Sequence, residues 1–507
     1  MAAHPERTAS DCGAGGCSHS EGEVDAAKPN AAPNVKGAMS WRALLIALAV
    51  WGMIYLPALG TLDMRGEEAR RALPAARMLE TGNFIVPYIG SDPYLRKPPL
   101  INWLIAASFK LTGQRTEFSA RIPSILAVLA VAVTFLSVAR RSLGETGALA
   151  GALMWLACLG IIVKGRTAEI EALYASLTGI ACICWLTFWK ERRSPWLLWV
   201  VPSIFLGLAL LAKGPTHLIF FYGTVVGVLW KQRELRRIWS FPHLAGAGMM
   251  LLIFALWLAP YLIVLENSRV ADVWSRELTG RVVRPIFHFH NWLLNVPKAL
   301  WYLLPWTLLL PFVRVSRVAD ERDRKLLVGL ACGIAAPLLL VLLMPAAMPR
   351  YALPLVAASV WLTAFALREN AIVLQKPARW IFAAVGMTCA ATLLYAVAIA
   401  PRLGAKSKVR PNGVRVNAIV PESARIFAVS PEFQPYLFYV RAPITYVDEV
   451  ASLPADARYV LVRQGGGKKT ARANREIEAL QPRPLLSLSD ERGHRSTLYE
   501  LTQSVAP

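Results

Sequence analysis

Charged residues are scarce in this chain of 507 residues, since they make up 17% of it whereas hydrophobic residues make up 55%. A typical soluble domain has about 25% charged residues, so an ordinary soluble protein is excluded. The apolar residues gather in blocks long enough for a helix to cross the core of a bilayer. Because backbone groups in a bilayer must bond within the protein, these blocks predict a bundle of transmembrane helices.

Acidic residues are also few, 33 against 55 Lys and Arg, which gives a formal net charge of +22. A charge of this size can indicate a nucleic-acid-binding protein. Most of the basic residues, however, lie between the apolar blocks, where they set topology and meet anionic lipid head groups. We therefore expect membrane lipids as partners and no nucleic acid.

Nothing in the chain indicates a disulfide framework. Five of the seven cysteines lie inside apolar blocks, where a free cysteine behaves as a small hydrophobic residue. The other two, Cys12 and Cys17, lie in residues 1–40, a polar stretch rich in Ala, Gly, Ser and Pro. This stretch lacks the layout of a signal peptide, so we expect a disordered cytoplasmic tail before a first membrane helix that is retained.

The apolar blocks predict an all-α polytopic membrane protein with about 11 to 13 transmembrane helices and some interfacial helices. A block at 98–112 is short and contains Lys110, so it is expected to be re-entrant or interfacial. The stronger blocks are residues 42–60, 119–139, 144–163, 172–189, 196–212, 216–230, 243–265, 296–313, 326–344, 351–367 and 380–400.

The distribution of Lys and Arg predicts that the N-terminus is cytoplasmic. In that orientation five short cytoplasmic loops are denser in Lys and Arg than the longer loops on the other side, as the positive-inside rule requires. Nearly every unusual polar motif then lies on the outer, periplasmic side, which indicates a site at one membrane surface rather than a transport path. The outer loops are residues 61–118, 164–171, 213–215, 266–295 and 345–350.

The composition changes after Pro401, which predicts a small periplasmic α/β domain at 403–507 beside a transmembrane domain at 41–402. The helix is expected at "TARANREIEAL" and short strands at "RIFAVS", "YLFYV", "ITYV", "RYVLVRQ" and "STLYELT". The segment "QGGGKKT" is not a phosphate loop, because Val462 and Lys469 occupy positions that require Gly and Ser or Thr.

The first outer loop, 61–118, opens with "DMRGEEARRA", a dense mixture of opposite charges directly after an apolar block. Its continuation places apolar residues on one helical face. Glu67 and Glu68 can each pair with Arg71 on that helix, for about 0.2–0.5 kcal/mol per pair. Taken alone, the run is typical of a salt-bridged interfacial helix; a catalytic site is the alternative.

Later in the same loop, Arg96 and Lys97 precede Pro98 and Pro99, which stiffen the backbone before an apolar helix. A lysine held at a helix start near the bilayer surface suits a phosphate group. Ordinary interfacial anchoring explains the same residues equally well.

The other outer loops add more ionisable residues at the ends of predicted spans. Glu171 begins an apolar block, at a depth where a carboxylate is costly and usually functional. Lys213 lies in "LLAKGP", and Arg350 with Tyr351 lies in "MPRYALPL".

The long loop 266–295 contains Arg281 and the segment "HFH", in which His288 and His290 could bind a metal ion. Their spacing is not specific, since residues two apart share a face only on a strand. A solvated or phosphate-facing pair is the preferred interpretation.

These motifs together resemble a known family. The run "GEEARRALPAARMLETGNFIVPYIGSDPYLRKPPLINWLIAASFKLTG", followed by "SARIPSIL", resembles the first outer loop of ArnT-like glycosyltransferases. That family is related to the protein O-mannosyltransferases and has the GT-C fold. "LLAKGP" and "MPRYALPL" resemble later landmarks in the expected order, so the similarity covers about residues 40 to 400.

The resemblance implies a glycosyltransferase of the bacterial inner membrane that uses a polyprenyl-phosphate-linked sugar donor at the periplasmic face. The expected acceptor is a lipid, such as lipid A, or another envelope acceptor. A protein O-glycosyltransferase and a transporter for a lipid-linked substrate are the alternatives. No cofactor is required by these motifs, and a divalent metal ion is left open.

The resemblance also implies roles for individual residues. Glu67 falls on the main acidic position, where the family usually has Asp, with Asp63 as the fallback; Glu171 falls on the second acidic position. Arg71 stands where the family usually has Tyr. The residues expected to bind substrates are Glu68, Arg70, Arg71, Tyr94, Lys97, Lys213, Arg281, His288, His290, Arg350 and Tyr351.

Overall fold

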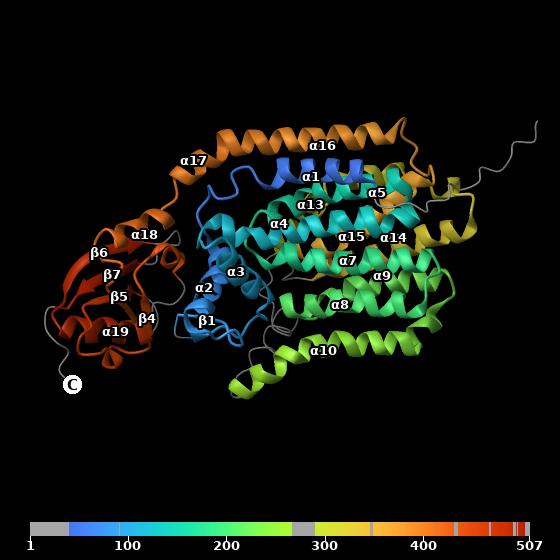
Figure 1. Ribbon diagram of the computed structural model, residues 1–507. Helices are drawn as coiled ribbons and strands as arrows, with labels where there is room; N and C mark the ends of the chain where they lie inside the picture. Colours follow the sequence, from blue (N-terminus) through green and yellow to red (C-terminus); the bar gives the residue numbers. More distant parts are fainter. Residues whose placement is uncertain are drawn as a thin grey trace, which may run out of the picture. The chain divides into compact units, whose positions relative to one another are not determined.

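The computed structural model describes residues 40–501, and within that range it leaves out residues 91, 266–288, 345–347, 430–433, 466–467, 490–492 and 494. The described chain is mostly helical, and its long helices lie side by side (Figure 1). A small sheet follows near the C-terminus. The predicted fold class is therefore confirmed.

Seven helices among the described residues are long and apolar enough to cross a membrane, judged by length and composition. Six of them coincide with one predicted span each. They are α7 (Ile170–Lys190), α8 (Pro195–Lys213), α10 (Phe241–Val264), α14 (Glu321–Leu343), η5 (Pro349–Leu355) continued by α15 (Val356–Arg368), and α16 (Pro377–Leu394) continued by η6 (Tyr395–Ile399) and α17 (Ala400–Ala405).

The seventh helix, Glu117–Leu156, covers the predicted span 119–139 and most of the span 144–163, because the chain reverses within it. The rest of the second span lies in α6 (Leu159–Gly165), after a break at 157–158. It consists of α4 (Glu117–Thr134), η1 (Phe135–Ala139) and α5 (Arg140–Leu156). The backbone leaves the helical conformation at Gly144, where a φ of +70° favours glycine. Phe135 packs against the position that a Cβ on Gly151 would occupy, so the two legs lie against each other.

Three shorter apolar helices occupy the predicted blocks 42–60, 98–112 and 216–230. A helix of this length rises only about 20 Å, less than the ~30 Å of a hydrocarbon core. The number of helices that are long enough to span is therefore lower than the number of apolar blocks. The short helices are α1 (Trp41–Tyr55), α3 (Leu100–Thr112) and α9 (His217–Lys231).

The predicted span 296–313 was wrong as a single helix. The chain there forms α13 (Asn295–Tyr302) and a separate 3-10 helix, η3 (Trp306–Phe312). Pro305 lies between the two helices, and it has no backbone N–H with which to extend the hydrogen bonds of α13. Hydropathy detects the apolar block but not this break.

Helices α9 and α14 pack closely through facing glycines. A Cβ on Gly227 would overlap the backbone of Gly329 and Gly333, and a Cβ on Gly329 would overlap the backbone of Gly227. Small residues of this kind let two membrane helices approach until their backbones touch.

The first outer loop folds into α2 (Gly66–Thr81), a two-stranded hairpin of β1 (Tyr88–Ile89) and β2 (Asp92–Pro93), and then α3. The predicted apolar face of α2 is buried except at Leu79, which is 38% exposed. Pro74 lies inside α2 without ending it. Helix α3 begins directly after Pro98 and Pro99, as predicted.

The C-terminal region contains a five-stranded sheet in the order β4-β3-β5-β7-β6. Strand β3 is parallel to β4 and β5, whereas β7 is antiparallel to β5 and β6. The strands are β3 (Ile426–Val429), β4 (Ile444–Val447), β5 (Tyr459–Gln464), β6 (Arg483–Ser489) and β7 (Arg495–Glu500), and the helices are α18 (Val409–Asn417) and α19 (Lys468–Ala479).

Two details of the C-terminal prediction need correction. The segment "YLFYV" is not a strand but mostly a 3-10 helix, η7 (Pro435–Tyr439), and strand β6 was missed. Leu437 and Phe438 are buried in η7, and so short an apolar run has no period that distinguishes a strand from a helix.

The remaining short helices are η2 (Leu235–Trp239), α12 (Phe289–Leu293), η4 (Val315–Arg317), η8 (Val450–Ser452) and α6 (Leu159–Gly165).

One hydrophobic core joins the first outer loop to the C-terminal region. Residues of α2 and α3, such as Ala76 and Phe109, belong to the same buried cluster as Leu437, Phe438 and Leu498. The first outer loop and the C-terminal region therefore fold against each other.

Candidate functional site

Glu67 lies in the first turn of α2, and its side chain is 35% exposed. Arg70 Nη1 lies 3.2 Å from one carboxylate oxygen, and Arg71 Nη2 lies 3.0 Å from the other. A helix brings residues three and four apart to the same side, so this grouping follows directly from the sequence. Glu67 is thus held by two guanidinium groups while its carboxylate remains accessible.

Arg71 is buried despite its charge. Its Nη1 donates to the Tyr94 hydroxyl at 3.0 Å, and the guanidinium lies 5.3 Å from the centre of the Tyr94 ring. Asn102 donates to the Arg71 backbone oxygen at 2.8 Å. Arg71 therefore ties Glu67 to the loop that follows the β1–β2 hairpin. We call Glu67, Arg70, Arg71 and Tyr94 the Glu67 cluster.

A second cluster forms around Glu171, at the start of α7. Lys213 Nζ at the end of α8 lies 3.4 Å from Glu171 Oε1, and Arg350 Nε in η5 lies 3.3 Å from the same oxygen. Lys213 Nζ also lies 5.2 Å and 5.1 Å from the ring centres of Tyr174 and Tyr351. Three outer loops that are far apart in the sequence thus meet at this Glu171 cluster.

The two clusters are electrostatically linked. The charge of Arg71 is close enough to act on the Glu171 carboxylate, and the charge of Lys97 is close enough to act on Lys213. Lys97 is half-buried in the segment between β2 and α3. Around Glu67 and Glu171 the cationic groups outnumber the carboxylates, so the combined site suits an anionic ligand such as a phosphate.

One ion pair near the Glu171 cluster was not predicted from the sequence. Lys164 Nζ lies 2.7 Å from Glu169 Oε2 in the second outer loop. Burial raises the pKa of the Glu169 carboxyl above its usual range, the Lys164 charge opposes this, and Glu171 adds to it. The signal in the sequence was a Lys and a Glu five residues apart between two apolar blocks.

Glu68 points away from the Glu67 cluster and forms a buried ion pair. Arg121 Nε and Nη2 lie 2.7 Å and 3.0 Å from its two oxygens, and the Ala168 backbone N–H donates to it at 2.9 Å. Arg121 also donates to the Leu62 backbone oxygen at 2.9 Å. Glu68 thus joins α2 to α4 and to the second outer loop, and its role in binding a substrate stays a prediction.

Replacing Arg121 by Leu is expected to destabilise the protein by about 3–5 kcal/mol, because Glu68 would remain buried without a partner. The measurement is thermal unfolding of the purified protein in detergent. Arg441→Ala is the matched control, because Arg441 and Glu422 form an exposed pair at 2.9 Å. A second variant, Glu68→Leu with Arg121→Leu, should recover much of the loss, and equal melting temperatures for Arg121→Leu and Arg441→Ala would contradict this account.

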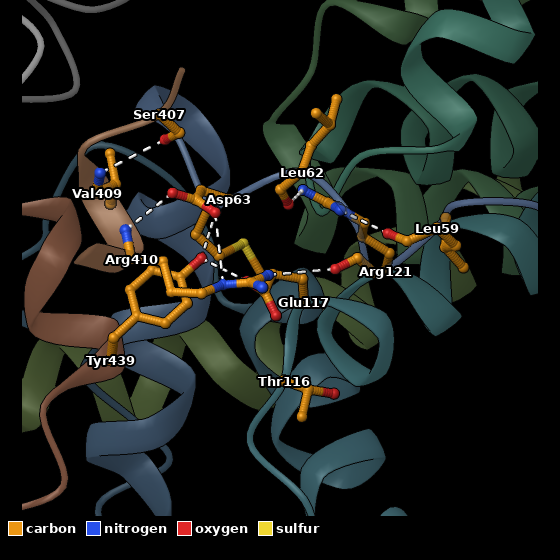
Figure 2. Close-up of polar contacts among 12 residues, drawn as sticks. Leu59, Leu62, Asp63, Thr116, Glu117, Arg121, Ser407, Val409, Arg410 and Tyr439 are labelled. Atoms are coloured by element: carbon orange, nitrogen blue, oxygen red, sulfur yellow. Dashed lines mark hydrogen bonds and ion pairs between the residues drawn. The ribbon is translucent and has the colours of Figure 1, made fainter. Parts of the chain in front are cut away.

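Asp63 is buried, and its two carboxylate oxygens contact Arg410 of α18 (Figure 2). It therefore lies in a contact with the C-terminal region rather than in the Glu67 cluster. Its place as an alternative catalytic acid stays a prediction.

The loop 266–295 holds three of the predicted site residues. Arg281 and His288 lie outside the described residues. His290 is exposed in the short helix α12. Their predicted roles in binding stay predictions.

The described residues contain no group of three His, Cys, Asp or Glu side chains that could hold a metal ion. The carboxylates that point into the site, Glu67 and Glu171, are each paired with basic side chains. This donor set does not fit a divalent cation, so no step of the chemistry is derived through a metal.

The chain is similar to several known proteins. A family model described as dolichyl-phosphate-mannose-protein mannosyltransferase matches residues 96–259. An undecaprenyl phosphate-α-4-amino-4-deoxy-L-arabinose arabinosyl transferase from Pseudomonas fluorescens is 25% identical over 62% of this chain and 57% of its own length. A transferase of the same description from Proteus mirabilis is 23% identical over the same shares. The chain thus spans a little over half the length of these curated relatives.

Among solved structures, ArnT from Cupriavidus metallidurans bound to undecaprenyl phosphate matches with a TM-score of 0.68 at 16% identity. The match covers 93% of this chain and 100% of that one. The apo form of the same protein matches with a TM-score of 0.67, over 90% of this chain and 97% of that one. At this identity the structural match shows a shared fold, and the sequence matches show that the chain is similar to ArnT-like glycosyltransferases.

Proposed function

We propose that this protein transfers a sugar from a polyprenyl-phosphate-linked donor to a lipid acceptor at the outer face of the membrane. The observation that carries the proposal is the convergence of Lys213 and Arg350 on Glu171, beside Lys97 and the Glu67 cluster. Cations held in place at a membrane surface suit a lipid phosphate. The similar ArnT structure was solved with undecaprenyl phosphate bound, which supports a donor of this class.

The reaction needs a leaving group that is stabilised and an acceptor that is positioned. The bond between the sugar C1 and the phosphate oxygen breaks, and its electron pair stays on the polyprenyl phosphate. Lys97, Lys213 and Arg350 receive that negative charge, so a strong general acid is unnecessary. The acceptor oxygen attacks C1 from the opposite side and inverts the configuration.

Glu67 is the proposed acceptor-side residue, because it is the accessible carboxylate of the Glu67 cluster. A hydroxyl acceptor would transfer its proton to Glu67 as the new bond forms. A phosphate acceptor, as on lipid A, has no such proton to lose, and Glu67 would then act through Arg70 and Arg71 to orient it.

The protein is a multi-pass inner-membrane protein, and we propose a cytoplasmic N-terminus and a periplasmic C-terminal domain. Reporter fusions after residues 140, 191 and 320 are all expected to report the cytoplasm, because these positions lie in the loops densest in Lys and Arg. The measurement pairs a periplasm-active reporter with a cytoplasm-active one at each position. A periplasmic signal at any of the three positions would show that the polar loops do not all lie on one side of the membrane.

The transfer itself is tested in vesicles that contain the purified protein, undecaprenyl phosphate-α-4-amino-4-deoxy-L-arabinose and lipid A. Mass spectrometry is expected to show lipid A heavier by one sugar, with release of undecaprenyl phosphate. If neither that donor nor other undecaprenyl-phosphate sugars react with lipid acceptors, while the donor is bound, the proposed acceptor class is wrong.

A protein acceptor is the second candidate, because the family model that matches 96–259 is described as a protein mannosyltransferase. The same vesicles supplied with envelope proteins distinguish the two classes. A strain lacking the protein should then lose sugar from its envelope proteins and not from its lipids.

A further inference from the structure

The C-terminal region contacts the beginning of the first outer loop through Arg410 (Figure 2). Arg410 lies in the first turn of α18, and its backbone N–H donates to Asp63 Oδ2 at 2.8 Å. Its Nε lies 3.4 Å from Asp63 Oδ1. The Asp63 side chain is 4% exposed and the Arg410 side chain is 43% exposed, so this contact is only partly shielded from water and from screening by salt.

The same side chain contacts the end of the loop. Arg410 Nε donates to Glu117 Oε1 at 3.1 Å, and its Nη2 pairs with the same oxygen. Glu117 is buried and is the first residue of α4. One guanidinium from the C-terminal region therefore joins the two ends of a loop that runs from 61 to 118.

Tyr439, at the end of η7, makes a second connection between the two ends. Its hydroxyl donates to Glu117 Oε1 at 2.7 Å and accepts from the Met64 backbone N–H at 2.7 Å. Burial, and then the Glu117 charge, raise the pKa of Tyr439, so the phenol keeps the proton that it donates. We call Asp63, Met64, Glu117, Arg410 and Tyr439 the Arg410 cluster.

Helix α2 closely follows two residues of the Arg410 cluster in the sequence. Asp63 and Met64 come directly before α2, which begins at Gly66, where φ is +46°. Glu67 is the next residue after Gly66. A shift of the segment that contains Asp63 and Met64 would therefore move the Glu67 carboxylate. Near the far end of α2, the Arg77 guanidinium lies 5.1 Å from the centre of the Tyr446 ring in β4.

We propose that Arg410 and Tyr439 are positioning residues for the transfer proposed above. They hold both ends of the first outer loop and so set where α2 places Glu67. The inference rests on the proposed function, and it makes the C-terminal region a part of the reaction site rather than an independent domain.

The test compares Arg410→Ala, Arg410→Lys and Tyr439→Phe with Arg441→Ala, which removes an exposed arginine of the same region. We expect kcat for transfer to fall about 10- to 100-fold in the first three, because small misplacements of reacting groups have effects of this size. The Kd for undecaprenyl phosphate alone should stay within about 2-fold, because no residue of the Glu171 cluster is altered. Arg410→Lys should retain more activity than Arg410→Ala.

A double variant separates positioning from general destabilisation. Arg410→Ala with Glu117→Gln should be no slower than the slower single variant, because both changes break the same connection. If the two changes acted independently, the fold-reductions in kcat of the single variants would multiply in the double variant. That result would overturn the proposal.

Hydrogen exchange of the whole protein in detergent needs no substrate and gives an independent result. The variants at 410 and 439 should exchange faster at residues 61–81, with exchange in α7, α8 and α14 unchanged. Wild-type exchange at 61–81 in Tyr439→Phe and Arg410→Lys would overturn the proposal even if the proteins are inactive. If the wild-type protein shows no transfer at all, the proposed function fails, and the exchange result still decides whether the C-terminal region holds the loop.

Discussion

Glu67→Gln is expected to lower the rate of sugar transfer about 10²- to 10⁴-fold if the acceptor is a hydroxyl, because a carboxylate base contributes a factor of this size. Glutamine keeps the shape of the side chain but cannot take up the acceptor proton. It also weakens the ion pairs with Arg70 and Arg71, which lie 3.2 Å and 3.0 Å from the carboxylate. The measurement is kcat in vesicles supplied with donor and acceptor.

The control for Glu67→Gln is Glu80→Gln in the last turn of α2, where the carboxylate lies 3.4 Å from Arg115 and is half exposed. Glu80→Gln should keep nearly wild-type activity. Glu67→Asp should retain more activity than Glu67→Gln, because aspartate occupies this position in the family that the sequence resembles. Near wild-type transfer by well-expressed Glu67→Gln would show that Glu67 is not the acceptor-side residue.

Lys213→Ala and Lys97→Ala are each expected to weaken binding of undecaprenyl phosphate by about 1.5–3 kcal/mol, roughly 10- to 150-fold in Kd. Each variant removes a cation that would contact the phosphate. In Lys213→Ala the Glu171 carboxylate still has a partner, because Arg350 Nε lies 3.3 Å from it. The measurement is a binding titration with undecaprenyl phosphate in detergent micelles.

Lys110→Ala is the matched control for these lysines, because Lys110 is exposed near the end of α3, in the same outer loop as Lys97. Its Kd should equal that of the wild-type protein. The affinity of the wild-type protein should also fall with added salt, and more steeply than that of Lys213→Ala. Equal affinities for Lys213→Ala, Lys97→Ala and Lys110→Ala would place the donor phosphate elsewhere.

Local patterns in the sequence were sufficient for much of this structure. The apolar blocks predict the helical membrane fold, and the helical spacing of apolar residues predicts the buried face of α2. The pairing of Glu67 with Arg71 follows from their spacing on one helix. The two prolines at 98 and 99 correctly mark the start of α3.

Local patterns did not predict the breaks and partners that depend on the rest of the chain. The block 296–313 reads as one span, but α13 ends before Pro305 and η3 begins after it. "YLFYV" reads as a strand, but it forms η7, where Tyr439 reaches Glu117. An apolar run of five residues fits a strand and a helical turn equally well until its neighbours are known.

The sequence by itself therefore determined the helical membrane fold and the acidic helix α2 that follows the first apolar block. Only the tertiary structure decided which of its two adjacent glutamates faces the site, because Glu68 finds its partner in Arg121, 53 residues away. It also decided that Arg71 is buried against Tyr94 and that Arg410 joins both ends of the first outer loop. Charges pair according to distance in space, and the folding of the chain, not the spacing of residues along it, sets those distances.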